Sequence, residues 1–294
     1  MKTRKLLAGV TVAAAVLAGG PAFADALSDL LTSQGPGPAT IGFSDYEAFG
    51  NLGPGPALQV GSTNYGVLEV RSITVNGNGV FSPSPSAYLV GVYSGITVTS
   101  IGNGGLETGN SGGVFSIYDV TSAELGSVGL NINTLFSQGT SGYTAGCVAN
   151  TQCYNGITNV GATDVLNYAL VPGADLINPA DTLQATINGT SFPPTGEASG
   201  YGVITGGADA GVFAKGGFTT SIGTSADLSL ADEFCPNGSN SGQCVTTVGN
   251  WVDESFDPVQ AAIPEPGSMA LLGGALLSLG FFRSRRQKKN HPSS

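Results

Sequence analysis

The amino-acid sequence predicts a mainly β protein, with an antiparallel β-sandwich or jelly-roll-like domain between two apolar terminal segments. Three observations lead to this prediction. Glycine and proline are abundant, with 46 and 16 residues, and no long stretch shows the period of a helix. Short runs of β-branched and aromatic residues recur between residues that favour turns. Asn-Gly pairs, which favour tight hairpin turns, stand at 76–77, 155–156, 188–189 and 237–238.

The expected strands are the runs in which apolar and β-branched residues dominate. The clearest is 182–187, where Leu183, Ala185 and Ile187 alternate with polar residues, as in a strand buried on one face. Helix is expected only in short pieces, within 26–32 and 122–136. Glycine-rich disorder is the alternative, but the apolar content of the runs favours a packed core. The other expected strands are 67–75, 88–93, 96–101, 114–120, 164–171, 202–205, 212–215 and 244–256, with a turn over Tyr93-Ser94-Gly95-Ile96.

The N-terminal 24 residues have the three parts of a secretory signal. Three cations within the first five residues precede an apolar run over 6–18, and the small-residue site Ala22-Phe23-Ala24 follows. The run is too short to be a stable membrane-spanning helix. We therefore expect residues 1–24 to form a signal helix that is cleaved after Ala24. An N-terminal anchor that is not cleaved is the alternative.

The C-terminal end holds a second apolar segment. Residues 267–282 are apolar, and five cations follow within 283–289. A helix of this length spans about 24 Å, which is slightly less than a hydrocarbon core of about 30 Å. We expect a single transmembrane helix over 267–282, with its basic tail in the cytoplasm and residues 25–263 outside. The N-terminal signal predicts the same topology.

The residues around this segment resemble a known sorting signal. Pro264-Glu265-Pro266, the short Gly/Ala/Leu segment and the basic cluster together resemble the PEP-CTERM sorting signal, over 264–289. The resemblance implies recognition by an exosortase, a membrane-embedded transpeptidase-like enzyme of Gram-negative bacteria that make exopolysaccharide. It also implies cleavage near Pro264-Glu265-Pro266, followed by release or transfer to the surface or matrix. Residues 287–294 extend further than is usual in the family, and a plain C-terminal anchor is the alternative.

The segment between the two ends is strongly acidic. We expect a β-rich extracellular domain over 25–252 and a linker over 253–263. The formal charge of the whole chain is −10, but the segment 25–263 has two cations, Arg71 and Lys215, against nineteen carboxylates, which is a charge of −17. Such a surface lacks cations that neutralise phosphates, so a nucleic-acid partner is not expected. The charge favours solubility, and attraction of divalent cations or basic partners is the alternative interpretation.

Four cysteines are candidates for disulfides, because an exported protein meets an oxidising environment. They are Cys147, Cys153, Cys235 and Cys244. Three connectivities are possible. Pairing of sequence neighbours is the simplest, and each bridge would then contribute roughly 2–3 kcal/mol. A zinc site is disfavoured, because the spacings do not fit one and no histidine is available to complete it.

One stretch, Gly109-Asn110-Ser111-Gly112-Gly113, fits the Gly-x-Ser-x-Gly pattern of serine nucleophiles. A serine hydroxyl needs a base to remove its proton. The single histidine, His291, lies beyond the membrane segment, and nothing around Lys215 supports a Ser-Lys pair. We therefore interpret Ser111 as part of a glycine-rich loop and expect no catalytic residue.

Scattered acidic and aromatic residues suggest three further kinds of site. Paired carboxylates serve glycoside hydrolysis when they are about 5–10 Å apart, but sequence does not place the acids at that distance. An irregular calcium site in the acidic loops is an open alternative. Aromatic residues could form a sugar-binding platform, although core packing is the more common role. The residues concerned are Asp232, Glu233, Asp253, Glu254 and Asp257 among the acids, and Tyr143, Tyr154, Tyr201 and Trp251 among the aromatics.

The sequence thus favours an exported protein without a cofactor or an enzymatic activity, which acts as a structural or adhesive component of exopolysaccharide or biofilm. The expected partners are an exosortase, the inner membrane transiently through the C-terminal helix, and exopolysaccharide as a candidate ligand. One alternative is a secreted polysaccharide-acting hydrolase with paired carboxylates. The other is a carbohydrate- or calcium-binding adhesin.

Overall fold

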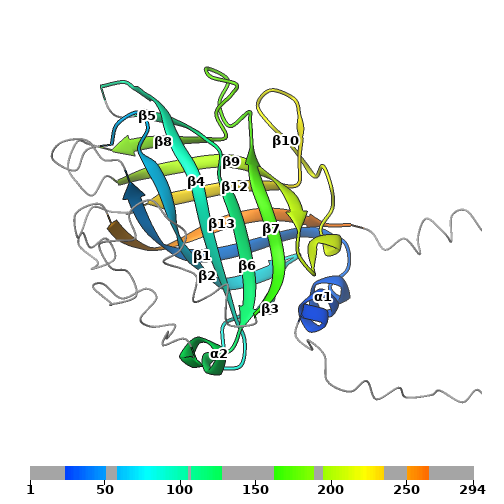
Figure 1. Cartoon of the computed structure of the whole chain (residues 1–294). Helices are drawn as coiled ribbons and strands as arrows, with labels where there is room; N and C mark the ends of the chain where they lie inside the picture. The colour runs from blue at the N-terminus through cyan, green and yellow to red at the C-terminus, as the bar shows by residue number, and fades with distance from the viewer. Residues whose placement is uncertain are drawn as a thin grey trace, which may run out of the picture.

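The computed structural model describes residues 24–50, 58–104, 107–127, 162–188, 195–234 and 250–264. This part of the chain is mainly β and antiparallel, which confirms that part of the predicted fold class (Figure 1). The elements in chain order are α1 (Ala24–Ser33), β1 (Gly37–Gly50), β2 (Thr63–Val75), β3 (Asn78–Phe81), β4 (Tyr88–Gly102), β5 (Glu107–Ser111), β6 (Val114–Val120), α2 (Ser122–Ser127), β7 (Thr163–Val171), β8 (Leu183–Asn188), β9 (Thr195–Gly206), the 3-10 helix η2 (Ala210–Val212), β10 (Phe218–Thr219), β11 (Ser225–Ala226), β12 (Leu228–Phe234) and β13 (Asn250–Ile263).

Eleven of the described strands form one antiparallel sheet, in the order β3-β2-β1-β13-β12-β9-β7-β6-β4-β5-β8. Because β2 also pairs with β4, and β9 with β8, the sheet closes on itself. In Figure 1, β4, β6 and β7 cross in front of β9, β12, β13, β1 and β2, so two layers of strands face each other. By hydrogen bonding these layers belong to one continuous sheet rather than to two separate sheets.

The core lies between the two layers. It contains Ile41, Val70, Leu166, Leu228 and Val259, each from a different strand and each at most 4 % exposed. Three aromatic rings stack on the inner side of β4, β6 and β7. Tyr93 lies 5.2 Å from Phe115, and Phe115 lies 4.5 Å from Tyr168, between ring centroids. These side chains fill the space that closure of the sheet encloses.

Both predicted helices are present, and each has a local reason. Helix α1 places Leu31 in the core with no exposed surface, while Leu30 on the other side is 46 % exposed. Helix α2 begins with a capping box: the Thr121 N–H donates to Glu124 Oε2 at 2.7 Å, and the Glu124 N–H donates to Thr121 Oγ1 at 3.2 Å. None of the helices in the described part of the chain has the length and apolarity that crossing a membrane requires. The predicted transmembrane segment and residues 1–23 of the predicted signal lie outside the described residues, and Ala24 is the first residue of α1.

The turn predictions have mixed outcomes. Asn76 and Gly77 have positive φ values of 54° and 79° and connect β2 directly to β3, as a two-residue type I′ hairpin requires. The predicted turn at Tyr93-Ser94-Gly95-Ile96 is wrong, because β4 runs without interruption through it. Gly95 has a φ of 80° at the point where β4 changes its partner from β6 to β5. The glycine therefore accommodates an irregularity of the strand instead of ending it.

Two other predictions are corrected by the structure. The run 212–215 is not a strand, since its first residue ends η2 and the next residues form an irregular segment. The predicted linker 253–263 is instead most of β13, which pairs with β1 from 250 to 263 apart from an irregularity at 254–256. Val259, Ala261 and Ile263 are buried at alternate positions, and this apolar alternation outweighs the acidic residues before it. The domain therefore continues to residue 263.

Candidate functional site

The C-terminal junction, Ala262–Pro264, is the place where the last strand meets the predicted sorting motif. Ala262 and Ile263 end β13 and pair with the first two residues of β1. Ile263 is 4 % exposed, whereas Pro264 directly after it is exposed. Glu265 and Pro266 lie outside the described residues. The sorting motif therefore follows the folded sheet without a spacer.

An irregular segment, 213–217, supports the junction from the side opposite β1. Within the described residues, the strand β12 pairs with β13 at Val259 and Gln260. Beyond that point the Ala214 N–H donates to the Ala262 carbonyl oxygen at 2.6 Å. Segment 213–217 thus takes the place of a neighbouring strand, and Ala262 is held from both sides.

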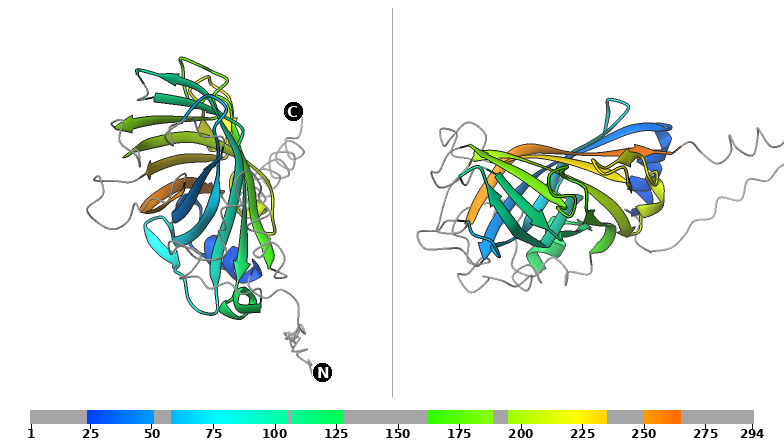
Figure 2. Two further views of the ribbon diagram at one scale, coloured as in Figure 1. Left: turned by 60° about the vertical axis from the view of Figure 1, so that its left-hand side comes forward. Right: turned by 90° about the horizontal axis from the view of Figure 1, so that it is seen from above.

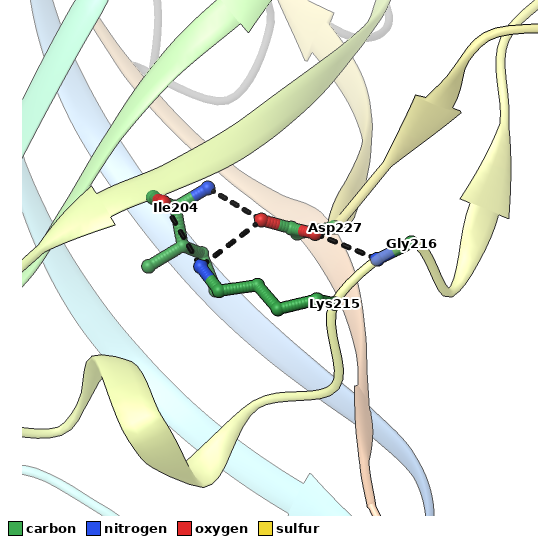
Figure 3. A network of polar contacts seen from close by, with 4 residues as sticks. All are labelled: Ile204, Lys215, Gly216 and Asp227. Carbon is green, nitrogen blue, oxygen red and sulfur yellow. Dashed lines mark hydrogen bonds and ion pairs between the residues drawn. The ribbon is translucent and has the colours of Figure 1, made fainter.

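Segment 213–217 is fixed by one buried carboxylate, that of Asp227 (Figure 3). Asp227 is 6 % exposed and stands between β11 and β12. Its Oδ1 accepts the Gly216 N–H at 2.7 Å, and its Oδ2 accepts the Ile204 N–H at 2.9 Å and the Lys215 ammonium at 3.2 Å. Lys215 Nζ also donates to the Ile204 carbonyl oxygen at 2.9 Å. The network ties the segment to β9 and β12.

The electrostatics of Asp227 favour its charged form. Burial alone would raise the pKa of its carboxyl, but the N–H groups of Gly216 and Ile204 and the ammonium of Lys215 lower the pKa to below its ordinary value. The ionised carboxylate is therefore the form that folding stabilises. Lys215 keeps much of its side chain in water, at 59 % exposed, so it contributes less than the two backbone donors.

The start of β1, which pairs with the junction, is held in turn by the hairpin between β2 and β3. The Asn76 N–H donates to the Pro38 carbonyl oxygen at 2.9 Å, and its side-chain amide donates to the carbonyl oxygens of Gln34 and Pro36, each at 3.2 Å. Helix α1 precedes this stretch and contacts η2 and β3. Figure 2 shows α1 and the end of β13 at the same end of the sheet. The predicted N-terminal and C-terminal processing points therefore adjoin one end of the molecule.

The two cations of the acidic segment are both paired with buried acids. Lys215 pairs with Asp227, as described above. Arg71 lies 2.7 Å from Glu69, which is 1 % exposed, and also donates to Ser44 Oγ at 3.3 Å. Burial raises the pKa of Glu69, and the charge of Arg71 opposes that rise. These cations therefore neutralise buried carboxylates and do not offset the surface acids.

The structure places the other candidate residues apart from the junction. Ser111 ends β5 and is partly exposed, next to Gly112 and Gly113 with positive φ values of 78° and 105°. Lys215 is committed to Asp227 and Ile204, so it is not held as a base for that serine. In the described ranges no three His, Cys, Asp or Glu residues come together as metal ligands.

Two of the four residues of the candidate sugar-binding platform, Tyr201 and Trp251, stand in described strands. Tyr201 in β9 is level with Ser229 of β12 and, through it, with Gln260 of β13. Trp251 lies nine residues away from Gln260 along the same strand, which is about 30 Å at a rise of about 3.3 Å per residue. The backbone positions of the two residues therefore lie far apart in the sheet. Tyr143, Tyr154 and the four cysteines, Cys147, Cys153, Cys235 and Cys244, lie outside the described residues.

Sequence reasoning missed the residues that secure the junction. Asp227 follows a short turn region and carries no motif, and no motif connects Lys215 with it. A signal did exist, since Lys215 is one of two cations among nineteen carboxylates in the acidic segment, so a nearby carboxylate is to be expected. The sequence does not show which acid Lys215 pairs with, because the tertiary structure determines that partner.

Comparison with known proteins identifies the C-terminal segment. A family model described as the PEP-CTERM protein-sorting motif matches residues 262–286. No curated protein and no solved structure matches the chain. The match begins at Ala262, inside β13, so its first residues are part of the folded sheet. The chain therefore carries a PEP-CTERM sorting motif at its C-terminal end, and that motif is characteristic of proteins that are exported and processed by an exosortase.

Proposed function

We propose that this chain is a structural or adhesive protein of the cell surface or extracellular matrix, without an enzymatic activity of its own. The sorting motif carries the proposal, because it implies export and processing by an exosortase. In this proposal the segment 267–282 holds the chain in the inner membrane transiently. Cleavage near Pro264-Glu265-Pro266 then releases or transfers the β domain to the surface.

The β domain supports a passive role through its architecture. Its sheet closes on itself, so few strand edges are left for uncontrolled pairing with other chains. Its core is filled by stacked aromatics and aliphatic side chains. The acidic surface keeps such a domain soluble in a crowded matrix, and exopolysaccharide is the candidate ligand. Exopolysaccharide binding is the adhesive part of the proposal.

The sorting step is tested by replacing Pro264 and Pro266 with alanine in the full chain, with a tag on the C-terminal tail. We expect the double variant to remain in the membrane fraction with its tail attached, whereas the unchanged chain reaches the surface or medium without it. A matched control replaces Pro83 and Pro85, in the connection between β3 and β4, with alanine. Equal distributions of all three chains, with tails intact, would contradict the proposal.

The passive role needs a separate test. The exported protein, recovered from the producing cells, is incubated with their own exopolysaccharide. We expect the polymer to keep its length and to retain the protein on sedimentation. A fall in polymer length, or an increase of reducing ends, would show a hydrolase instead. Recovery of all the protein in the supernatant would remove the adhesive part of the proposal.

A further inference from the structure

The inference concerns how the folded domain affects processing at the C-terminal junction, and it rests on the proposed function. Only three residues separate Ile263, the last residue of β13, from Gly267, where the predicted transmembrane segment begins. Four extended peptide units span at most about 14 Å. While the segment is in the membrane, the end of the sheet is therefore held close to the membrane surface.

The residues before Pro264 are not available as an extended peptide. Enzymes that bind peptides commonly do so by pairing with an extended backbone. In this chain Ala262 and Ile263 already pair with β1, and the Ala262 carbonyl oxygen also accepts the Ala214 N–H. Ile263 is 4 % exposed. An enzyme that needed these two residues would first have to detach them from the sheet.

The packing of segment 213–217 opposes that detachment. A side chain added at Gly217 would have its Cβ 3.5 Å from the Ala262 Cβ, so the segment lies directly against the junction. Phe213 at the start of the segment is 5 % exposed and belongs to the core. The Asp227 network then holds the backbone at Gly216. Moving Ala262 out of the sheet would therefore disturb a fixed segment as well as a strand pair.

We propose that the folded domain restricts where and how fast the motif is processed. Segment 213–217 and the start of β1 shield Ala262 and Ile263, so that the exosortase reaches the chain only from Pro264 onward. The end of the domain formed by this segment and the start of β1 is then the surface that lies against the membrane-embedded enzyme. Processing in this arrangement is slowed by the lack of a spacer between the sheet and the membrane.

The first test lengthens the spacer in the full chain. Four residues, Gly-Ser-Gly-Ser, are inserted between Ile263 and Pro264, and loss of a C-terminal tag is followed in a pulse-chase experiment. We expect processing about tenfold faster, which corresponds to about 1.4 kcal/mol, because the insertion adds accessible chain between the sheet and the motif. A control carries the same insertion between Asn103 and Gly104, an exposed turn, and is expected to be processed at the original rate.

The second test determines the C-terminal residue of the released protein by mass spectrometry. We expect it to be Pro264 or a later residue. A last residue at or before Ile263, or a rate with the junction insertion that is equal to or below the original rate, would overturn the inference. Retention of the tag by the unchanged chain would instead refute the proposed function, so the two failures can be distinguished.

Discussion

Replacement of Asp227 by alanine should be among the most destabilising single changes to a polar residue in the described part of the chain. The carboxylate accepts hydrogen bonds from two backbone N–H groups and from Lys215. Its loss leaves the Ile204 N–H buried without an acceptor, which costs about 1–3 kcal/mol. The Gly216 N–H and the Lys215 ammonium are nearer to water and add about 1 kcal/mol together. We expect a total of about 3 kcal/mol.

Two companion variants separate the contributions. Asp227→Asn retains one acceptor oxygen and replaces the other by an NH2 group. It should cost about 2 kcal/mol, because one backbone N–H then faces that NH2 group and has no acceptor. Lys215→Met removes a largely exposed charge and should cost at most about 1 kcal/mol. Glu197→Ala, on an exposed side chain of β9, is the control and should change stability by about 0.5 kcal/mol or less.

Urea unfolding of the exported protein, recovered from the producing cells, measures these differences at pH 7. Because the folded-state pKa of Asp227 is lowered, its contribution is fully present above the unfolded value near 4 and is lost as the pH falls through the folded value. The gap between the unchanged protein and Asp227→Asn should therefore narrow in acid. If Asp227→Ala were as mild as Glu197→Ala, the role assigned to the network would be refuted.

Three further predictions concern stability, each measured by the same unfolding experiment. Leu31→Ala in α1 should cost about 2–5 kcal/mol because this side chain is fully buried, while Leu30→Ala nearby should cost little; equal effects would show that α1 does not pack as described. Burial, with a smaller effect of Glu124, raises the pKa of Asp119 to about 6. The free energy of unfolding of the unchanged protein should therefore fall as the pH rises from 4 to 6, because the folded state then has to give up a proton that it binds more tightly than the unfolded state does. Asp119→Asn should remove most of that loss, about 1 kcal/mol for a half-buried group, and an unaltered pH profile would contradict this. Gly77→Ala should cost about 1 kcal/mol because its φ of 79° is strained for alanine, and a neutral result would exclude the type I′ turn.

Local sequence signals predicted the features that depend on neighbouring residues. The hairpin at Asn76-Gly77 is confirmed because its two positive φ values are a local requirement. The strand at 114–120 has the predicted bounds, and helix 26–32 lies within α1. The resemblance of the C-terminal end to the sorting signal is confirmed by the family model.

The errors arose where the decisive partner is distant in sequence. Acidic residues before Pro264 suggested a linker, but pairing with β1, more than 200 residues earlier, makes this stretch a strand inside the sheet. Gly95 suggested a turn, but β2 on one side and β6 and β5 on the other keep β4 continuous. A strand needs its neighbours to satisfy its backbone, and sequence proximity does not reveal them.

By itself, the sequence determined the sorting motif at the C-terminal end and the acidity of the segment before it, because these depend on composition and short motifs. Only the tertiary structure decided that the sheet closes on itself and that the sorting motif begins within a strand. It also decided that Lys215 and Asp227 secure the segment beside that strand. The physical reason is that charge and motif are local properties, whereas each backbone partner in a sheet is chosen by folding of the whole chain.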